Sequence, residues 1–97
     1  MDIDDWREKI DELDVRLLEL LNRRAEYALE IGKIKIANGQ PIYLPEREAA
    51  VLKRLRRLNS GPLSGEAVQR IFRQVIEESR RIEHGPEETD PGPSASH

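Results

Sequence analysis

The sequence predicts an all-α fold of three helices, one long, one short and one of medium length, and three observations predict it. Apolar residues recur at alternating spacings of three and four, which is the pattern of a helical seam. Proline and glycine cluster between these periodic segments rather than inside them. No segment has the period of two that is typical of a strand.

The first periodic segment predicts one helix over roughly residues 3–37. Asp2 or Asp4 can cap its start, and Asn38-Gly39-Gln40-Pro41 supplies its end. A helix of this length is about 50 Å long, which the two shorter helices cannot cover. We therefore expect the exposed part of the seam to pack against a second copy of the chain. The seam consists of Ile3, Trp6, Ile10, Leu13, Leu17, Leu20, Tyr27, Ile31 and Ile34.

Two further helices follow the first break. Pro45 suits the first position of a short helix, which Asn59-Ser60-Gly61-Pro62 ends. Ser64 is a good N-cap for a third helix, which is expected to end near Glu83 or His84. The predicted order is therefore long helix, short helix, medium helix.

Composition excludes several classes of protein. At 97 residues the chain has room for one domain, which we assign to residues 1–84, followed by a disordered polar tail at 85–97. The absence of cysteine excludes disulfides and thiolate chemistry, and His84 and His97 do not suggest a metal site. A net charge of −3 gives little attraction to nucleic acid. The N-terminus lacks the basic and apolar segments of a signal peptide or membrane span, so we expect a cytoplasmic protein.

Two cations interrupt the apolar face of the first helix. Continuing the seam beyond Leu17 and Leu20 leads to Arg24, and Lys35 projects from the same face close to three turns later. A buried guanidinium is disfavoured unless a carboxylate or a bound anion meets it. Two interpretations stay open here: the cations bind an anionic ligand, or they reach solvent and pair with glutamates.

The other two helices carry further polar candidates. Arg47 and Glu48 open the second helix after Pro45, and because adjacent residues point in different directions, one is expected to face a pocket while the other flanks it. A solvated helix cap is the alternative for this pair. Ser79 interrupts the apolar stripe of the third helix, and Glu83 follows one turn later. Both can reach a common cavity, or Ser79 bonds back to a carbonyl and Glu83 is exposed.

Several short motifs, in this order and spacing, resemble the all-helical chorismate mutase family over about residues 5–84. The resemblance is to the free-standing, monofunctional bacterial members, and it implies an entwined homodimer. It also implies a concerted Claisen rearrangement of chorismate to prephenate, without a cofactor, in phenylalanine and tyrosine biosynthesis. The motifs are Arg7-Glu8-Lys9-Ile10-x-x-Leu13-Asp14, Arg23-Arg24, Gly32-Lys33-x-Lys35, Pro45-x-Arg47-Glu48 and Phe72-x-x-Val75-Ile76-Glu77-Glu78-Ser79.

The resemblance implies roles for the cations of the first helix. Arg24, Lys35 and Arg7 correspond to the carboxylate-binding cations of the family, and Lys35 also donates to the ether oxygen. Arg7 lies about 25 Å along the helix from Arg24, so one substrate meets both only if they come from different chains. This agrees with the family, in which the partner supplies this arginine. Lys35, Glu83 and Arg24 are the expected catalytic residues.

The resemblance assigns the remaining contacts and also shows two departures. Glu48 accepts a hydrogen bond from the ring hydroxyl, Arg47 supports that corner, and Ser79 contacts a carboxylate. Leu44 stands where relatives often have an aspartate, so its contact is expected to come from the backbone. Glu83 stands where many relatives have glutamine at the ether oxygen, and it must be protonated in order to donate there.

Two other functions stay in competition with this interpretation. Isochorismate-pyruvate lyases share the fold but lack the glutamate of the Arg-Glu pair, which this chain retains as Glu48. A non-catalytic helical dimerisation module would use Arg24 and Lys35 in structural ion pairs only. The expected partners are a small dicarboxylate and a second copy, with no nucleic acid or membrane, and a complex with another enzyme of the pathway is left open.

Overall fold

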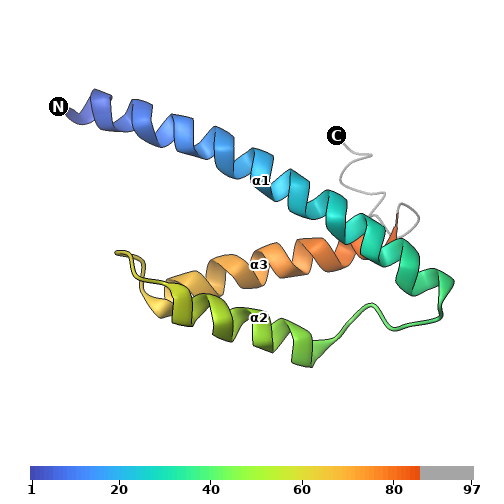
Figure 1. Cartoon of the computed structure of the whole chain (residues 1–97). Helices are drawn as coiled ribbons and strands as arrows, with labels where there is room; N and C mark the ends of the chain where they lie inside the picture. The colour runs from blue at the N-terminus through green and yellow to red at the C-terminus, as the bar shows by residue number, and fades with distance from the viewer. Residues whose placement is uncertain (86–97) are drawn as a thin grey trace, which may run out of the picture.

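The computed structural model describes residues 1–85, in which two loops join three helices (Figure 1). Helix α1 spans Ile3–Ala37, α2 spans Pro45–Leu58 and α3 spans Gly65–His84. These bounds confirm the all-α prediction and the predicted order of helices. The predicted disordered tail lies outside the described residues except for Gly85. No helix in the described range is long and apolar enough to cross a membrane.

Local side-chain and backbone interactions set the helix ends. Asp2, rather than Asp4, caps α1: its carboxylate accepts a hydrogen bond from the Asp5 backbone at 3.0 Å, and Asp5 returns the same interaction to the Asp2 backbone. At the other end, Gly39 has a φ of 67°, a left-handed conformation that glycine adopts without a Cβ clash. The Ser64 hydroxyl accepts a hydrogen bond from the Ala67 backbone at 3.0 Å and starts α3.

Helix α3 is the central element of the arrangement. It packs against both α1 and α2, whereas within residues 1–85 the backbones of α1 and α2 do not come close to each other. Figure 1 shows α2 beside α3, with the second half of α1 meeting the C-terminal part of α3 and the first half of α1 extending away. The space between α1 and α2 is therefore bounded by α3 and by the loop at residues 38–44.

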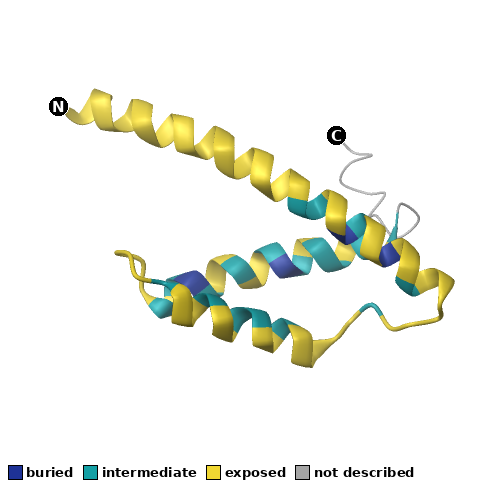
Figure 2. Ribbon diagram, in the orientation of Figure 1, coloured by how far each residue is buried: buried dark blue, intermediate teal, exposed yellow. Residues whose placement is uncertain are grey.

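The single chain has a small core. Only Ala28, Gly32, Val68 and Ile76 are buried among the described residues. The seam on the first half of α1 is exposed (Figure 2), and even Trp6 keeps 55% of its surface accessible. The radius of gyration is 16.6 Å, against about 12 Å for a compact globule of this length. This uncovered seam is the surface that the predicted second copy would bury.

Gly32 lies where the backbones of α1 and α3 come close together. A Cβ atom on this residue would lie 2.4 Å from the backbone oxygen of Glu83 and 2.6 Å from its Cα. Only glycine permits such an approach, because the opposing atoms belong to the backbone and cannot rotate away. The close contact brings Lys35, almost one turn further along α1, next to the side chain of Glu83.

Candidate active site

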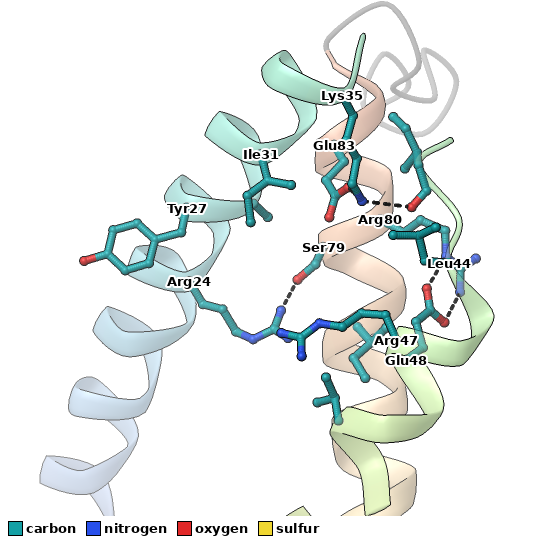
Figure 3. Close-up of a pocket in the computed structure, with 14 residues that line it drawn as sticks. Arg24, Tyr27, Ile31, Lys35, Leu44, Arg47, Glu48, Ser79, Arg80 and Glu83 are labelled. Atoms are coloured by element: carbon teal, nitrogen blue, oxygen red, sulfur yellow. Dashed lines mark hydrogen bonds and ion pairs between the residues drawn. The ribbon is translucent and has the colours of Figure 1, made fainter. Parts of the chain in front are cut away.

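A cavity of about 420 Å³ lies between the three helices and the α1–α2 loop (Figure 3). This volume is within the range of small-molecule sites. Residues one turn apart on the facing sides of α1 and α3 supply two of its walls. Its charged and hydroxyl lining, apart from Tyr27, consists of Arg24, Lys35, Arg47, Glu48, Ser79, Arg80 and Glu83. The rest of the lining consists of Tyr27, Ala28, Ile31, Ile42, Leu44, Val51 and Ile76.

Arg24 and Ser79 meet across the α1–α3 side of the cavity. Arg24 Nη1 donates a hydrogen bond to Ser79 Oγ, and Ser79 Oγ donates in turn to the Val75 carbonyl at 3.0 Å. Ser79 therefore both reaches the cavity and donates a hydrogen bond to its own helix. The sequence analysis had left these as two alternatives for Ser79. Since a guanidinium has five N–H donors, Arg24 retains donors for a ligand.

Lys35 and Glu83 form an ion pair at the end of the cavity next to the α1–α2 loop. Lys35 Nζ lies 2.7 Å from Glu83 Oε1, and the two side chains are only 15% and 14% exposed. The same ammonium donates to the Ile42 carbonyl at 3.2 Å, which ties the loop to both helices. The interpretation of Glu83 as an exposed helix-end residue is wrong. Glu83 acts here as an acceptor, so donation to a ligand requires a proton on its carboxyl group.

Glu48 is held by an arginine that the sequence analysis missed. Arg80 Nε and Nη2 donate to the two carboxylate oxygens of Glu48 at 3.0 and 3.1 Å. The Arg80 guanidinium also lies over the Tyr43 ring, 4.6 Å from its centroid. The hydrogen bonds with Glu48 raise the pKa of Arg80 further above its ordinary value, so this residue stays charged. The sequence does indicate this position, because Arg80 follows the buried Ile76 by four residues on α3 and therefore lies on the same face of the helix.

Arg47 and Glu48 both line the cavity, where the sequence predicted one residue facing a pocket and the other flanking it. Adjacent helical residues are separated by about 100° around the axis. A cavity that wraps around the first turn of α2 is therefore lined by both. Figure 3 shows Arg24 and Arg47 reaching toward each other from α1 and α2.

The charges of the lining favour an anionic ligand. Four cations and two carboxylates line the cavity. The ion pairs formed within residues 1–85 include Lys35 and Arg80 but neither Arg24 nor Arg47. Two guanidinium groups that face one cavity without a carboxylate favour a ligand with two negative charges. Among these described residues no group of three His, Asp or Glu side chains is arranged to hold a metal ion.

Leu44 lines the cavity as the residue that precedes α2, whereas Arg7 does not reach it. Arg7 lies near the start of α1, where its side chain is 71% exposed and its Nη1 is 3.7 Å from Asp4 Oδ1. Seven of the eight residues predicted for the site thus surround one cavity in a single chain. Arg7 can contribute to such a cavity only from another chain.

Comparison with known proteins identifies the family. The sequence profile described as chorismate mutase type II matches residues 6–84. The chain belongs to the type II chorismate mutase family. Among curated members, it is 47% identical over 77 residues to the bifunctional chorismate mutase/prephenate dehydratase of Neisseria gonorrhoeae, a match that covers 79% of this chain and 21% of that protein. The corresponding Pseudomonas aeruginosa protein is 43% identical over 82 residues, with 79% and 22% covered. The chain thus spans about a fifth of the length of these curated chorismate mutase relatives.

Two solved chorismate mutases have the same fold. The chorismate mutase (form II) of Thermus thermophilus is 30% identical and superposes with a TM-score of 0.84, covering 86% of this chain and 94% of that chain. The Helicobacter pylori chorismate mutase, solved in complex with prephenate, is 38% identical with a TM-score of 0.76, covering 84% and 88%. The family assignment agrees with the resemblance inferred from the sequence motifs.

Proposed function

We propose that this chain converts chorismate to prephenate, and that residues 1–84 form the catalytic unit. The observation that carries the proposal is the cavity of about 420 Å³ in which Arg24 and Arg47 face inward and pair with no carboxylate among residues 1–85. Chorismate carries two carboxylates, which match two such guanidinium groups in charge and geometry. Membership of the family and the likeness to a chorismate mutase solved with prephenate support the same substrate class.

The chemistry of this reaction suits a cavity without a nucleophile. The rearrangement is intramolecular: the ether C–O bond breaks while a C–C bond forms, and no atom is gained or lost. The protein needs to hold the folded conformer and to stabilise the negative charge that develops on the ether oxygen. Charged side chains fixed by a helical framework and by hydrogen bonds can supply both effects.

The proposed reaction gives roles to seven of the residues that line the cavity. Arg24, held by Ser79, binds one carboxylate, and Arg47, which supports the corner of Glu48, meets the other carboxylate. Lys35 uses one of its three N–H donors on Glu83 and one on the Ile42 carbonyl, which leaves one for the ether oxygen.

The remaining residues complete the cavity around the ring. Glu48 accepts a hydrogen bond from the ring hydroxyl, and the backbone of Leu44 contacts the substrate in place of an acidic side chain. Glu83 lies at the ether oxygen beside Lys35 and donates there when it is protonated. No cofactor takes part in this scheme.

The proposal includes a homodimer that completes each site with Arg7 of the partner. The first half of α1 leaves its apolar seam uncovered, and a second α1 can bury it. The same packing carries the exposed Arg7 away from its own cavity toward that of the other chain. Light scattering should give about twice the chain mass of 11.2 kDa.

The deciding experiment is an assay of the purified chain with chorismate and, separately, with isochorismate. We expect chorismate to disappear and prephenate to form, while isochorismate is not cleaved. Arg81→Gln is the matched control, because Arg81 is exposed and pairs with Glu78 on its own helix. Cleavage of isochorismate alone would support the lyase function, and inactivity on both substrates would support a non-catalytic module. A bicyclic dicarboxylate resembling the transition state should also raise the melting temperature.

A further inference from the structure

We propose that Arg80 is a positioning residue, which aims the Glu48 carboxylate at the substrate and prevents it from neutralising the substrate-binding arginines. This inference rests on the proposed function, because it concerns how Glu48 meets the ring hydroxyl. It assigns to Arg80 an effect exerted through Glu48 and not a contact with the substrate.

The geometry of the Arg80–Glu48 pair fixes the carboxylate in two directions. Arg80 uses two different nitrogens, Nε and Nη2, on the two oxygens of Glu48, so the carboxylate plane cannot rotate independently of the guanidinium. Each oxygen has about two lone-pair sites, and the pair uses one of them. Glu48 therefore remains able to accept a hydrogen bond from a hydroxyl group in the cavity.

The charges around Glu48 explain why it needs a dedicated partner. Arg24 and Arg47 line the same cavity and have no carboxylate partner of their own within residues 1–85. A mobile Glu48 would pair with one of them and compete with the carboxylates of the substrate. Because Arg80 holds Glu48 on the α3 side, both guanidinium groups stay available to a dianion.

Arg80 also stabilises the wall of the cavity that faces the loop. Its guanidinium lies 4.6 Å from the centroid of Tyr43, in the loop between α1 and α2. Because the backbones of α1 and α2 stay apart within the described part, this loop depends on α3 and on the hydrogen bond from Lys35 to Ile42. One side chain on α3 thus joins the loop to the first turn of α2, where Glu48 lies.

A kinetic double-mutant cycle tests this role. Arg80→Gln should lower kcat/KM for chorismate by roughly 10-fold, the effect of a charged hydrogen bond. If Arg80 acts through Glu48, the double variant Arg80→Gln/Glu48→Gln should be no less active than Glu48→Gln alone. Arg80→Lys should recover part of the loss, because an ammonium can pair with one oxygen but cannot fix the plane. Arg81→Gln should match the parent, since Arg81 pairs with Glu78 at 3.4 Å and does not line the cavity.

The possible results separate this inference from the proposed function. If the parent does not rearrange chorismate, the proposed function and this inference both fail. If the parent is active but the losses multiply in the double variant, Arg80 acts by a route other than Glu48 and only this inference fails. Normal activity of Arg80→Gln would also overturn it. If Arg80→Gln does not fold, the same cycle with Arg80→Lys decides.

Discussion

The substitution Gly32→Ala tests the close packing of α1 on α3. The added methyl would lie 2.4 Å from the Glu83 backbone oxygen and 2.9 Å from its carbonyl carbon, whereas ordinary contacts begin near 3.4 Å. The opposing atoms are backbone, so no side-chain rotation can make room. Helices α1 and α3 must therefore move apart by about 1 Å at the end of the cavity where Lys35 meets Glu83.

Two opposing effects decide the sign of the change in stability. Alanine is favoured over glycine within a helix by about 0.8–1 kcal/mol. Overpacking against a fixed backbone costs about 1–3 kcal/mol. We expect overpacking to win, with a net decrease of up to about 2 kcal/mol in the free energy of unfolding. The activity should also decrease, because moving α1 away from α3 displaces the Lys35 ammonium from its position in the cavity.

The assay is denaturant unfolding at one fixed protein concentration, because the stability of a dimer depends on concentration. Gly61→Ala is the matched control: a Cβ at Gly61 would have no atom within 4 Å, and its φ is not in the left-handed region. It should therefore be close to neutral. If Gly32→Ala proves as stable as the parent or more stable, the close packing of α1 on α3 is refuted.

Four further predictions concern the site and the start of α1. Arg24→Ala and Lys35→Ala should each lower kcat/KM at least ~10²-fold in steady-state assays, while the free energy of unfolding changes little. If either variant keeps near-normal turnover, the residue replaced in it does not belong to the site. Mixing an Arg7→Ala chain with an Arg24→Ala chain should restore some activity, and no recovery in proven heterodimers would count against shared sites. Glu83→Gln should raise kcat/KM at neutral pH, because it replaces an anion near the ether oxygen with a permanent donor; a decrease would exclude that position for Glu83. The hydrogen bond from the Asp5 backbone lowers the pKa of Asp2 below its ordinary value of 3.8, so the cap is fully formed above pH 3.8 and is lost as the pH falls through the folded-state pKa. Hydrogen exchange of the backbone amides at the start of α1 should follow this loss. The variant Asp2→Asn should abolish the pH dependence.

The bounds of the helices could be predicted from the sequence because they depend on neighbours within about four residues. Asp2 and Ser64 accept hydrogen bonds from backbone groups three residues on, and Gly39 supplies the left-handed turn after α1. Such interactions do not require knowledge of the tertiary structure. The three helices accordingly begin and end within about one residue of the predicted positions.

The candidate site was only partly accessible to the same reasoning. Arg24 was found because it stands where the apolar seam expects an aliphatic residue, and this type of exception is visible in sequence alone. Arg80 was missed because an arginine on the last turns of a helix is usually solvated, and its partner Glu48 is 32 residues away. Which of several possible carboxylates a cation pairs with depends on how the helices cross, which periodicity does not specify.

The ion pairs of the cavity suggest why it suits a dianion. Among residues 1–85, Lys35 pairs with Glu83 and Arg80 pairs with Glu48, which leaves Arg24 and Arg47 to meet the two carboxylates of the proposed substrate. Binding would then neutralise the lining, and the partner's Arg7 would add one positive charge to a partly closed cavity. A surplus cation stabilises the transition state more than the ground state, because negative charge concentrates on the ether oxygen as the C–O bond breaks. Removing a cation from this cavity should therefore slow the reaction, whereas removing the anion beside Lys35 should not.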